Sequence, residues 1–134
     1  MHGFNQGSHT VRDLVLSRQP DIFLLQEHWL TPANLDKLQE LSPQYLCFCS
    51  SAMRSTVESG IMYGRPFGGV AVLVNNKLEK CTEILCSADR YIILSVGNAL
   101  STCIYRVLAQ LIGWTLLRIL CVMCLYGSKS IMIA

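Results

Sequence analysis

The residues best suited to chemistry lie where a strongly apolar run meets polar side chains. Ile22-Phe23-Leu24-Leu25 is followed directly by Gln26 and Glu27. Such a run is typical of a buried strand that presents polar side chains at its C-terminal end. An ionised carboxylate beside a hydrophobic element is costly unless it is solvated, paired or bound to a metal. Glu27 is therefore either a structural carboxylate, which caps a turn or pairs with an arginine, or a metal ligand, and spacing alone favours the structural role.

The seven cysteines do not indicate a metal site or a disulfide framework. Their spacings are Cys47-x-Cys49, Cys81-x4-Cys86, a single Cys103 and Cys121-x2-Cys124. No closely spaced histidine pair accompanies them, and structural zinc needs four thiolate or imidazole ligands. We therefore expect no zinc, and instead reduced, buried thiols in an intracellular protein. The amino terminus also lacks the cationic start and apolar stretch of a secretory signal.

Length and composition predict one globular domain followed by an apolar tail. The 134 residues are 51% hydrophobic and 15% charged, which allows a core and excludes a wholly disordered chain. The net charge of +2 does not by itself indicate nucleic acid or a membrane surface. Residues 91–134 contain no acidic residue and only Arg106, Arg118 and Lys129 as bases. We place a boundary near residue 97, with a domain at 1–97 and a tail at 98–134.

The elements that must position Glu27 are predicted to alternate between helices and strands. Thr10-x2-Asp13 resembles a capping box, so a helix is predicted from Thr10 to the residue before Pro20. Thr31-Pro32 begins a second helix, which ends at Pro43. Strands are predicted at 21–27, 45–49, 68–74, 78–85 and 90–96, with a loop at 50–67 and a hairpin turn at 75–77. This order predicts an α/β domain with a mixed sheet covered by helices.

The apolar tail has three interpretations. Val107 to Tyr126 is long enough to span a membrane, and its Leu, Ile and Val residues favour insertion by roughly 3–6 kcal/mol. Arg118 opposes insertion by about 2.5–3.5 kcal/mol, and Gln110 adds to that cost. The segment could therefore be a tail anchor, a helix packed on the domain, or a tail that does not fold well.

Three blocks of the sequence resemble one family. Asp21-Ile22-Phe23-Leu24-Leu25-Gln26-Glu27-His28-Trp29-Leu30 resembles the Gln-Glu motif of the endonuclease/exonuclease/phosphatase superfamily, and looks closest to the apurinic-type endonuclease domains of non-LTR (LINE-like) retrotransposons. The Gly-Gly strand at 64–74 and the strand at 90–96 match in the same order. The resemblance extends from about His2 to Val96. It implies a four-layer α/β sandwich, incomplete here, that hydrolyses DNA phosphodiesters with Mg²⁺ or Mn²⁺.

The resemblance also implies roles for individual residues. Glu27 matches the metal ligand of the family, and Gln26 is its neighbour at the substrate. Arg65 could contact a phosphate, although a solvated loop cation is the alternative interpretation. Asn5 is a candidate substitute, at a different offset, for the asparagine of the family's first strand. Magnesium suits such a site because it prefers oxygen ligands and stabilises charge on phosphoryl oxygens.

Several motifs of the family are missing from the sequence. There is no Asp-x-Asn and no C-terminal Ser-Asp-His, and the last histidine is His28, so general acid–base catalysis lacks a histidine after the first block. We therefore expect a truncated nuclease-like domain, derived from a retrotransposon, with little or no activity. An uncovered sheet edge or apolar face would promote self-association.

Two alternatives concern the tail. The chain could be a small membrane-tethered or protein-interaction protein that acts through its apolar C-terminal segment. Residues from about 97 onward could also be read-through from another frame, which the abrupt loss of acidic residues would fit. DNA is the partner that the intact family implies, and the substrate is otherwise open.

Overall fold

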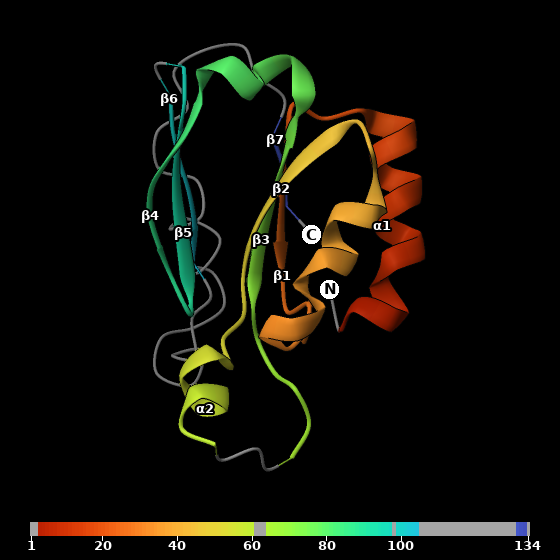
Figure 1. The fold of residues 1–134 in the computed structure, drawn as a ribbon. Helices are drawn as coiled ribbons and strands as arrows, with labels where there is room; N and C mark the ends of the chain where they lie inside the picture. The colour runs from red at the N-terminus through yellow and green to blue at the C-terminus, as the bar shows by residue number, and fades with distance from the viewer. Residues whose placement is uncertain (1–2, 61–63, 98, 105–130, 134) are drawn as a thin grey trace, which may run out of the picture.

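The computed structural model describes residues 3–60, 64–97, 99–104 and 131–133, the last two ranges as backbone only (Figure 1). The elements are α1 (Phe4–Arg18), β1 (Ile22–Gln26), η1 (Pro32–Leu41), β2 (Tyr45–Ser50), α2 (Arg54–Glu58), β3 (Val70–Asn75), η2 (Asn76–Cys81), β4 (Thr82–Ala88), β5 (Tyr91–Val96), β6 (Ala99–Ile104) and β7 (Ile131–Ile133). The strands form sheet A, ordered β2-β3-β1-β7, and sheet B, ordered β4-β5-β6. The predicted α/β class is confirmed.

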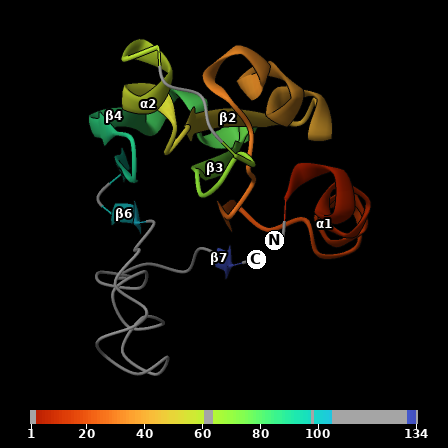
Figure 2. The same ribbon diagram turned by 90° about the horizontal axis from the view of Figure 1, so that it is seen from below.

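The central strands β1 and β3 of sheet A are buried on both faces, which explains the continuous apolar run of β1. Phe23 and Leu25 pack in a cluster with residues of α1 and η1. Ile22 and Leu24 point to the opposite face and pack with buried residues of β5 in sheet B. Figures 1 and 2 show the resulting order of layers, with α1 on one side of sheet A and sheet B on the other. The described chain thus forms three layers: helices, sheet A and sheet B.

Sheet A joins segments from both ends of the chain. β1 lies between β3, to which it is antiparallel, and β7, to which it is parallel. β2 completes the sheet by pairing antiparallel with β3. Five residues of β3, Val70 to Val74, are buried, so this strand lies at the centre of the molecule. The carboxyl end of β1 therefore projects from the best-packed part of the fold.

The predicted hairpin at 75–77 is wrong. The Asn75 side chain accepts a hydrogen bond from the backbone N–H of Lys77 and caps η2, which carries the chain from sheet A to sheet B. Leu78 in η2 packs against the apolar cluster between the sheets. β4 then pairs with β5 rather than with β3. The turn residues at 75–77 do follow the end of β3, but the chain then crosses from sheet A to sheet B instead of forming a hairpin.

The first helix begins earlier than predicted. Thr10 is exposed inside α1, and the N-cap is Gly3, whose φ of 82° suits glycine. Gly3 N–H donates to the Glu27 carbonyl and Phe4 N–H to the His28 carbonyl, both at 2.8 Å. These partners lie far away in the sequence, which is why local capping rules missed this start. The predicted end before Pro20 is confirmed.

Most of the remaining elements follow the predictions, but the strand predicted at 78–85 begins only at Thr82, because η2 occupies Asn76–Cys81. The predicted strands at 21–27, 45–49, 68–74 and 90–96 correspond to β1, β2, β3 and β5 within about two residues. η1 begins at Pro32 after the N-cap Thr31, as predicted, although it is a 3₁₀ helix. The loop predicted at 50–67 instead contains the short helix α2. Ser51 Oγ accepts from Met53 N–H just before α2, and Met53 is buried.

The structure describes only part of the C-terminal segment. β6 pairs with β5, and β7 pairs with β1, so backbone beyond the boundary proposed at residue 97 belongs to both sheets. The apolar segment 105–130, on which the helical tail, the anchor and the interaction hypothesis depend, lies outside the described residues. Within the described residues, none of the helices has the length and hydropathy needed to span a bilayer.

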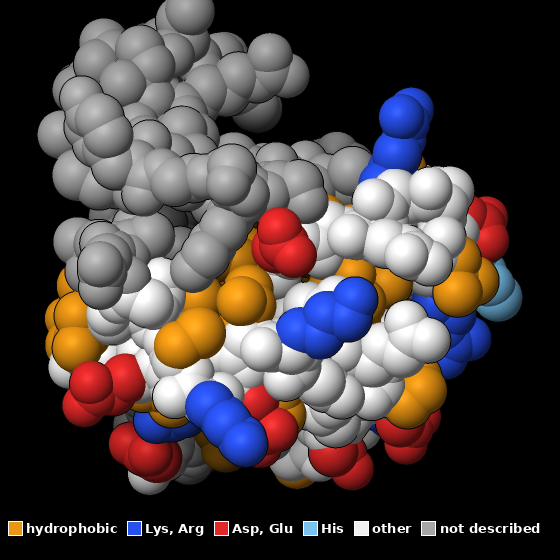
Figure 3. Space-filling model, turned by 90° about the horizontal axis from the view of Figure 1, so that it is seen from above, with side chains coloured by type: hydrophobic (Ala, Val, Ile, Leu, Met, Phe, Trp, Pro, Cys, Tyr) orange, Lys and Arg blue, Asp and Glu red, His pale blue; other side chains and the backbone are white. Residues whose placement is uncertain are grey.

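Sheet B is less covered than sheet A. In β5 the alternate residues Ile92, Leu94 and Val96 are buried against sheet A. In the edge strand β4, Ile84 and Leu85 are 51% and 53% exposed. On the molecular face seen in Figure 3, acidic and basic side chains are interspersed with apolar ones, and neither charge sign forms a broad patch.

The described thiols are free and differ in exposure. Cys47 and Cys49 are half-buried on β2, whereas Cys81 and Cys86 are exposed. The expectation of buried thiols is therefore wrong for the latter two, because they lie in η2 and in an edge strand. A hydrogen bond from Cys47, aided by the charge of Arg54, lowers the pKa of Cys49.

Candidate functional site

The loop after β1 is held in an unusual backbone conformation. Glu27 and Trp29 have φ values of 63° and 56°, a left-handed region that non-glycine residues rarely adopt. Such residues persist only where surrounding contacts fix them, and they cluster at functional sites. Glu27 N–H donates to the Gly69 carbonyl at 3.0 Å, and Trp29 N–H donates to the Gly68 carbonyl at 2.9 Å. The carbonyls of Glu27 and His28 also accept hydrogen bonds from the N–H groups of Gly3 and Phe4. The loop is therefore bonded both to the start of α1 and to the residues just before β3.

Glu27 lies at the carboxyl end of β1 with its carboxylate in a defined position. Its Oε2 accepts a hydrogen bond of 2.6 Å from the indole Nε1 of Trp29. Gln26 is the last residue of β1, is partly buried, and lies opposite Val70 of β3. The Trp29 contact was not foreseen, because the sequence shows only that an aromatic residue follows the acid by two positions.

His28 is a buried structural residue rather than an acid–base group. Its Nδ1 accepts from Leu30 N–H at 3.0 Å, so Nε2 must carry the proton that it shares with the Ser50 carbonyl at 3.0 Å. Burial lowers the pKa of His28 from its ordinary value, so the ring is neutral. Both ring nitrogens are occupied, and the side chain has no solvent exposure.

The second glycine before β3, Gly69, leaves room for this histidine. A Cβ at Gly69 would overlap the His28 ring, and the φ of 91° at that position also favours glycine. Gly3 plays the same part for Trp29, since a Cβ there would lie 2.7 Å from the indole Cε3. Gly69 is therefore required by the loop that holds Glu27.

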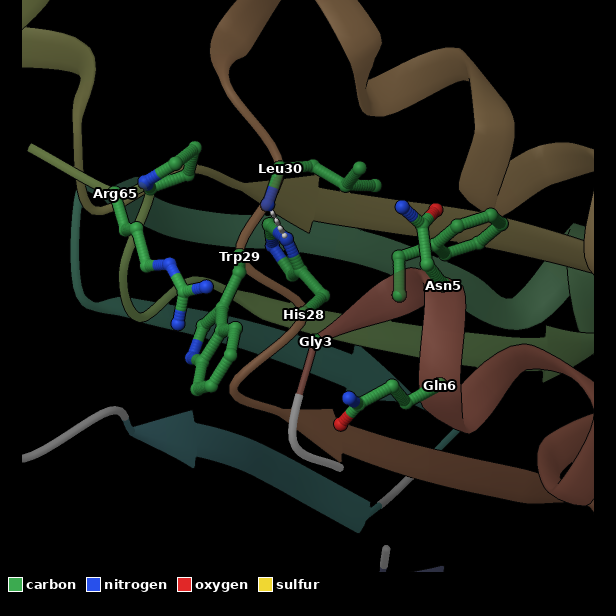
Figure 4. Close-up of a pocket in the computed structure, with 9 residues that line it drawn as sticks. Gly3, Asn5, Gln6, His28, Trp29, Leu30 and Arg65 are labelled. Atoms are coloured by element: carbon green, nitrogen blue, oxygen red, sulfur yellow. Dashed lines mark hydrogen bonds between the residues drawn. The ribbon is translucent and has the colours of Figure 1, made fainter.

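A pocket of about 300 Å³ opens beside this loop (Figure 4). Its walls include Asn5 and Gln6 from the first turn of α1, Trp29 from the loop, and Arg65 from the segment before β3. The structure thus brings together two of the predicted site residues, Asn5 and Arg65. Glu27 and Gln26 do not line the pocket, but Glu27 is joined to it through the indole of Trp29.

The described residues do not offer a metal ion a closed set of side-chain ligands. Among residues 3–60 and 64–97, no three His, Cys, Asp or Glu side chains cluster closely enough to hold a metal. Magnesium often keeps several waters and uses one or two carboxylates together with substrate phosphate. Glu27 fits that limited role, whereas a site built mainly of protein ligands is not formed by this part of the chain.

The comparison with protein families decides the ancestry. The model of the Endonuclease/Exonuclease/phosphatase family matches residues 2–110, which is most of the chain. This chain belongs to that family. No curated protein and no solved structure gives a match. The matched range includes Glu27, the glycine pair and β6, and it confirms the resemblance at the level of the family. Family membership supports a nuclease- or phosphatase-like domain of a generally divalent-metal-dependent kind, with nucleic acid as a substrate class.

Proposed function

We propose that this chain carries part of the active site of a divalent-metal-dependent phosphodiesterase, with Glu27 as a metal ligand. The observation that carries the proposal is the fixed position of Glu27 at the end of β1. Its backbone is bonded to both Gly3 and Gly69, and its carboxylate to Trp29. A fold that holds one carboxylate in a strained conformation, in a family of metal-dependent hydrolases, is best explained by a role at the metal.

The neighbouring residues have distinct parts in this proposal. Trp29 positions the Glu27 carboxylate through its indole N–H. Gln26 lies at the same strand end, where its amide could reach a bound substrate. Arg65 is exposed and supplies the nearby positive charge that a phosphate needs. Mg²⁺ or Mn²⁺, when bound, would stabilise charge on the phosphoryl oxygens. Asn5 faces the pocket from α1, and we assign it to substrate rather than to the metal.

We further propose that the chain by itself cleaves phosphodiesters slowly or not at all. A single carboxylate should hold a hydrated ion weakly. The sequence contains no Asp-x-Asn, and His28, its last histidine, is buried with both ring nitrogens engaged. His28 is thus not available as a general base. DNA as the substrate and a non-LTR retrotransposon as the origin remain proposals that rest on the Gln-Glu and Gly-Gly blocks.

The metal role can be tested by Mn²⁺ binding, followed by electron paramagnetic resonance of the free ion. We expect weak, saturable binding to the purified chain that Glu27→Gln removes. Glu58→Gln is the matched control, because Glu58 is an exposed carboxylate on α2. Binding that survives Glu27→Gln would contradict the assignment. A plasmid-nicking assay with Mg²⁺ tests the second point, and Glu27-dependent nicking at a substantial rate would refute the proposed inactivity.

A further inference from the structure

We propose that the pocket beside Glu27 binds a single unstacked nucleotide, with its base against Trp29 and a phosphate at Arg65. The choice of a nucleotide among planar ligands rests on the proposed phosphodiesterase function. The pocket itself does not include Glu27, so it is a binding site separate from the metal ligand. The site would favour nucleic acids that have an unstacked base over an intact duplex.

The size and walls of the pocket fit one base. A volume of about 300 Å³ is at the small end of ligand pockets, which suits a single planar ring system better than a peptide or a duplex. Trp29, Leu30 and Pro66 provide apolar wall. Base–aromatic stacking tolerates any sequence because every base has a π-face.

The polar groups around the pocket suit the rest of a nucleotide. Asn5 and Gln6 are exposed amides, each with a donor and an acceptor for a base edge. The Arg65 guanidinium has no hydrogen-bond or ion-pair partner among the described residues, so it is available for a phosphate. Figure 4 shows the indole of Trp29 between the side chains of Arg65 and Gln6. The same pocket therefore has an aromatic ring for stacking, a positive charge for a phosphate and an amide for a base edge.

The stacking platform is fixed before any ligand arrives. The indole is held by its bond to Glu27 Oε2 at 2.6 Å and packs on Gly3, where a Cβ would be too close. Preorganisation of this kind reduces the entropy that a ligand must lose on binding. Because the same indole touches the proposed metal ligand, a base on Trp29 would lie next to the carboxylate. The pocket could therefore align a strand with the proposed metal.

The test uses the full chain with Trp114→Phe, which leaves Trp29 as its only tryptophan. A short single-stranded oligothymidylate is added in EDTA, and Trp29 fluorescence is followed. We expect saturable quenching by the single strand and much less by a duplex of equal length. Affinities of variants are then measured by the anisotropy of a fluorescein-labelled single strand. Trp29→Ala should weaken binding about 5- to 150-fold, and Trp29→Phe should retain most of it.

Arg65→Gln tests the phosphate contact without disturbing the core, because Arg65 is exposed. It should lower the affinity and reduce the slope of log K against log salt by about 0.7. Arg90→Gln is the matched control, an exposed arginine outside the pocket, and should change neither. Absence of quenching, equal quenching by duplex, or equal affinities of Arg65→Gln and Arg90→Gln would overturn the proposal.

Because oligonucleotide binding is measured in EDTA and metal binding is measured with Mn²⁺, the two experiments test this inference and the proposed function separately. If Glu27→Gln removes Mn²⁺ binding while single strands leave Trp29 unquenched, the pocket assignment fails and the metal assignment stands. If single strands quench Trp29 but Mn²⁺ binding does not depend on Glu27, the metal assignment fails and the pocket assignment stands.

Discussion

Sheet A and sheet B share one apolar layer, but among the strands whose side chains are described, only β1 and β3 of sheet A are buried on both faces. In β3 the residues Val70 to Val74 are all buried, whereas β5 buries alternate residues and the edge strand β4 exposes Ile84 and Leu85. The strained loop with Glu27 and Trp29 extends from sheet A. The difference indicates that the rigid sheet supports the site, because strained residues need firmly packed neighbours. Sheet B completes the core by covering one face of sheet A.

The difference in burial between the two sheets predicts that two leucine-to-alanine variants differ in stability. This is the largest effect that we expect. Leu25→Ala in β1 removes a fully buried side chain and should lower the free energy of unfolding by about 2–5 kcal/mol. Leu85→Ala in β4 removes a side chain that is 53% exposed and should cost less than about 0.5 kcal/mol. Urea unfolding followed by circular dichroism measures both. Equal costs would mean that sheet B is packed as tightly as sheet A.

A pair of glycines tests the support of the site loop. Gly69→Ala places a Cβ into the His28 ring at a φ of 91°, so we expect a loss of about 2–4 kcal/mol. Gly60→Ala has a similar φ of 74° but open space around it, and should cost only about 1–2 kcal/mol. Urea unfolding again gives the difference. If both substitutions cost the same, the loop is not held against His28 as the structure shows.

The buried histidine should make stability depend on pH. Because burial lowers the pKa of His28, the folded chain binds fewer protons than the unfolded chain below the ordinary pKa of about 6.5. The free energy of unfolding should therefore fall as the pH decreases from about 7.5 through 6.5 towards the folded pKa, by no more than about 1.4 kcal/mol per pH unit.

Variants assign this pH dependence to one residue. His28→Gln should remove most of the slope between about pH 7.5 and 5.5, while also lowering stability at every pH because buried partners lose their bonds. His9→Gln, which changes an exposed residue of α1, is the control substitution. An unchanged slope in His28→Gln would show that another group titrates.

The exposed edge of sheet B should affect association more than stability. Ile84→Lys introduces a charge on the edge strand β4, which opposes edge-to-edge pairing. We expect less self-association in sedimentation experiments and a change in unfolding free energy within about 0.5 kcal/mol. Thr10→Lys, which adds the same charge at an exposed position of α1, controls for charge alone. Association that persists unchanged in Ile84→Lys would place the contact elsewhere.

The sequence predicted the parts of the fold that depend on local patterns. The apolar run before Gln26 predicted a buried strand, and Thr31-Pro32 predicted the start of η1. It missed the start of α1, because Gly3 and Phe4 are held by carbonyls of a distant loop. It also assigned a hairpin at Asn75, since alternation and turn residues do not reveal which sheet a strand will join. The sequence marks Asn5 and Arg65 as separate candidates and does not predict the pocket that they share.

By itself the sequence determined that a carboxylate follows a buried strand and that the surrounding blocks match a family of phosphoesterases. Both conclusions follow from residue types at short spacing, because a buried strand and a family motif are each visible as a local pattern in the sequence. Only the tertiary structure decided what surrounds that carboxylate. The Trp29 bond to Glu27, the His28 ring on Gly69 and the pocket beside them depend on contacts between distant segments. Backbone hydrogen bonds from α1 and from the start of β3 fix these contacts, and no local pattern specifies them.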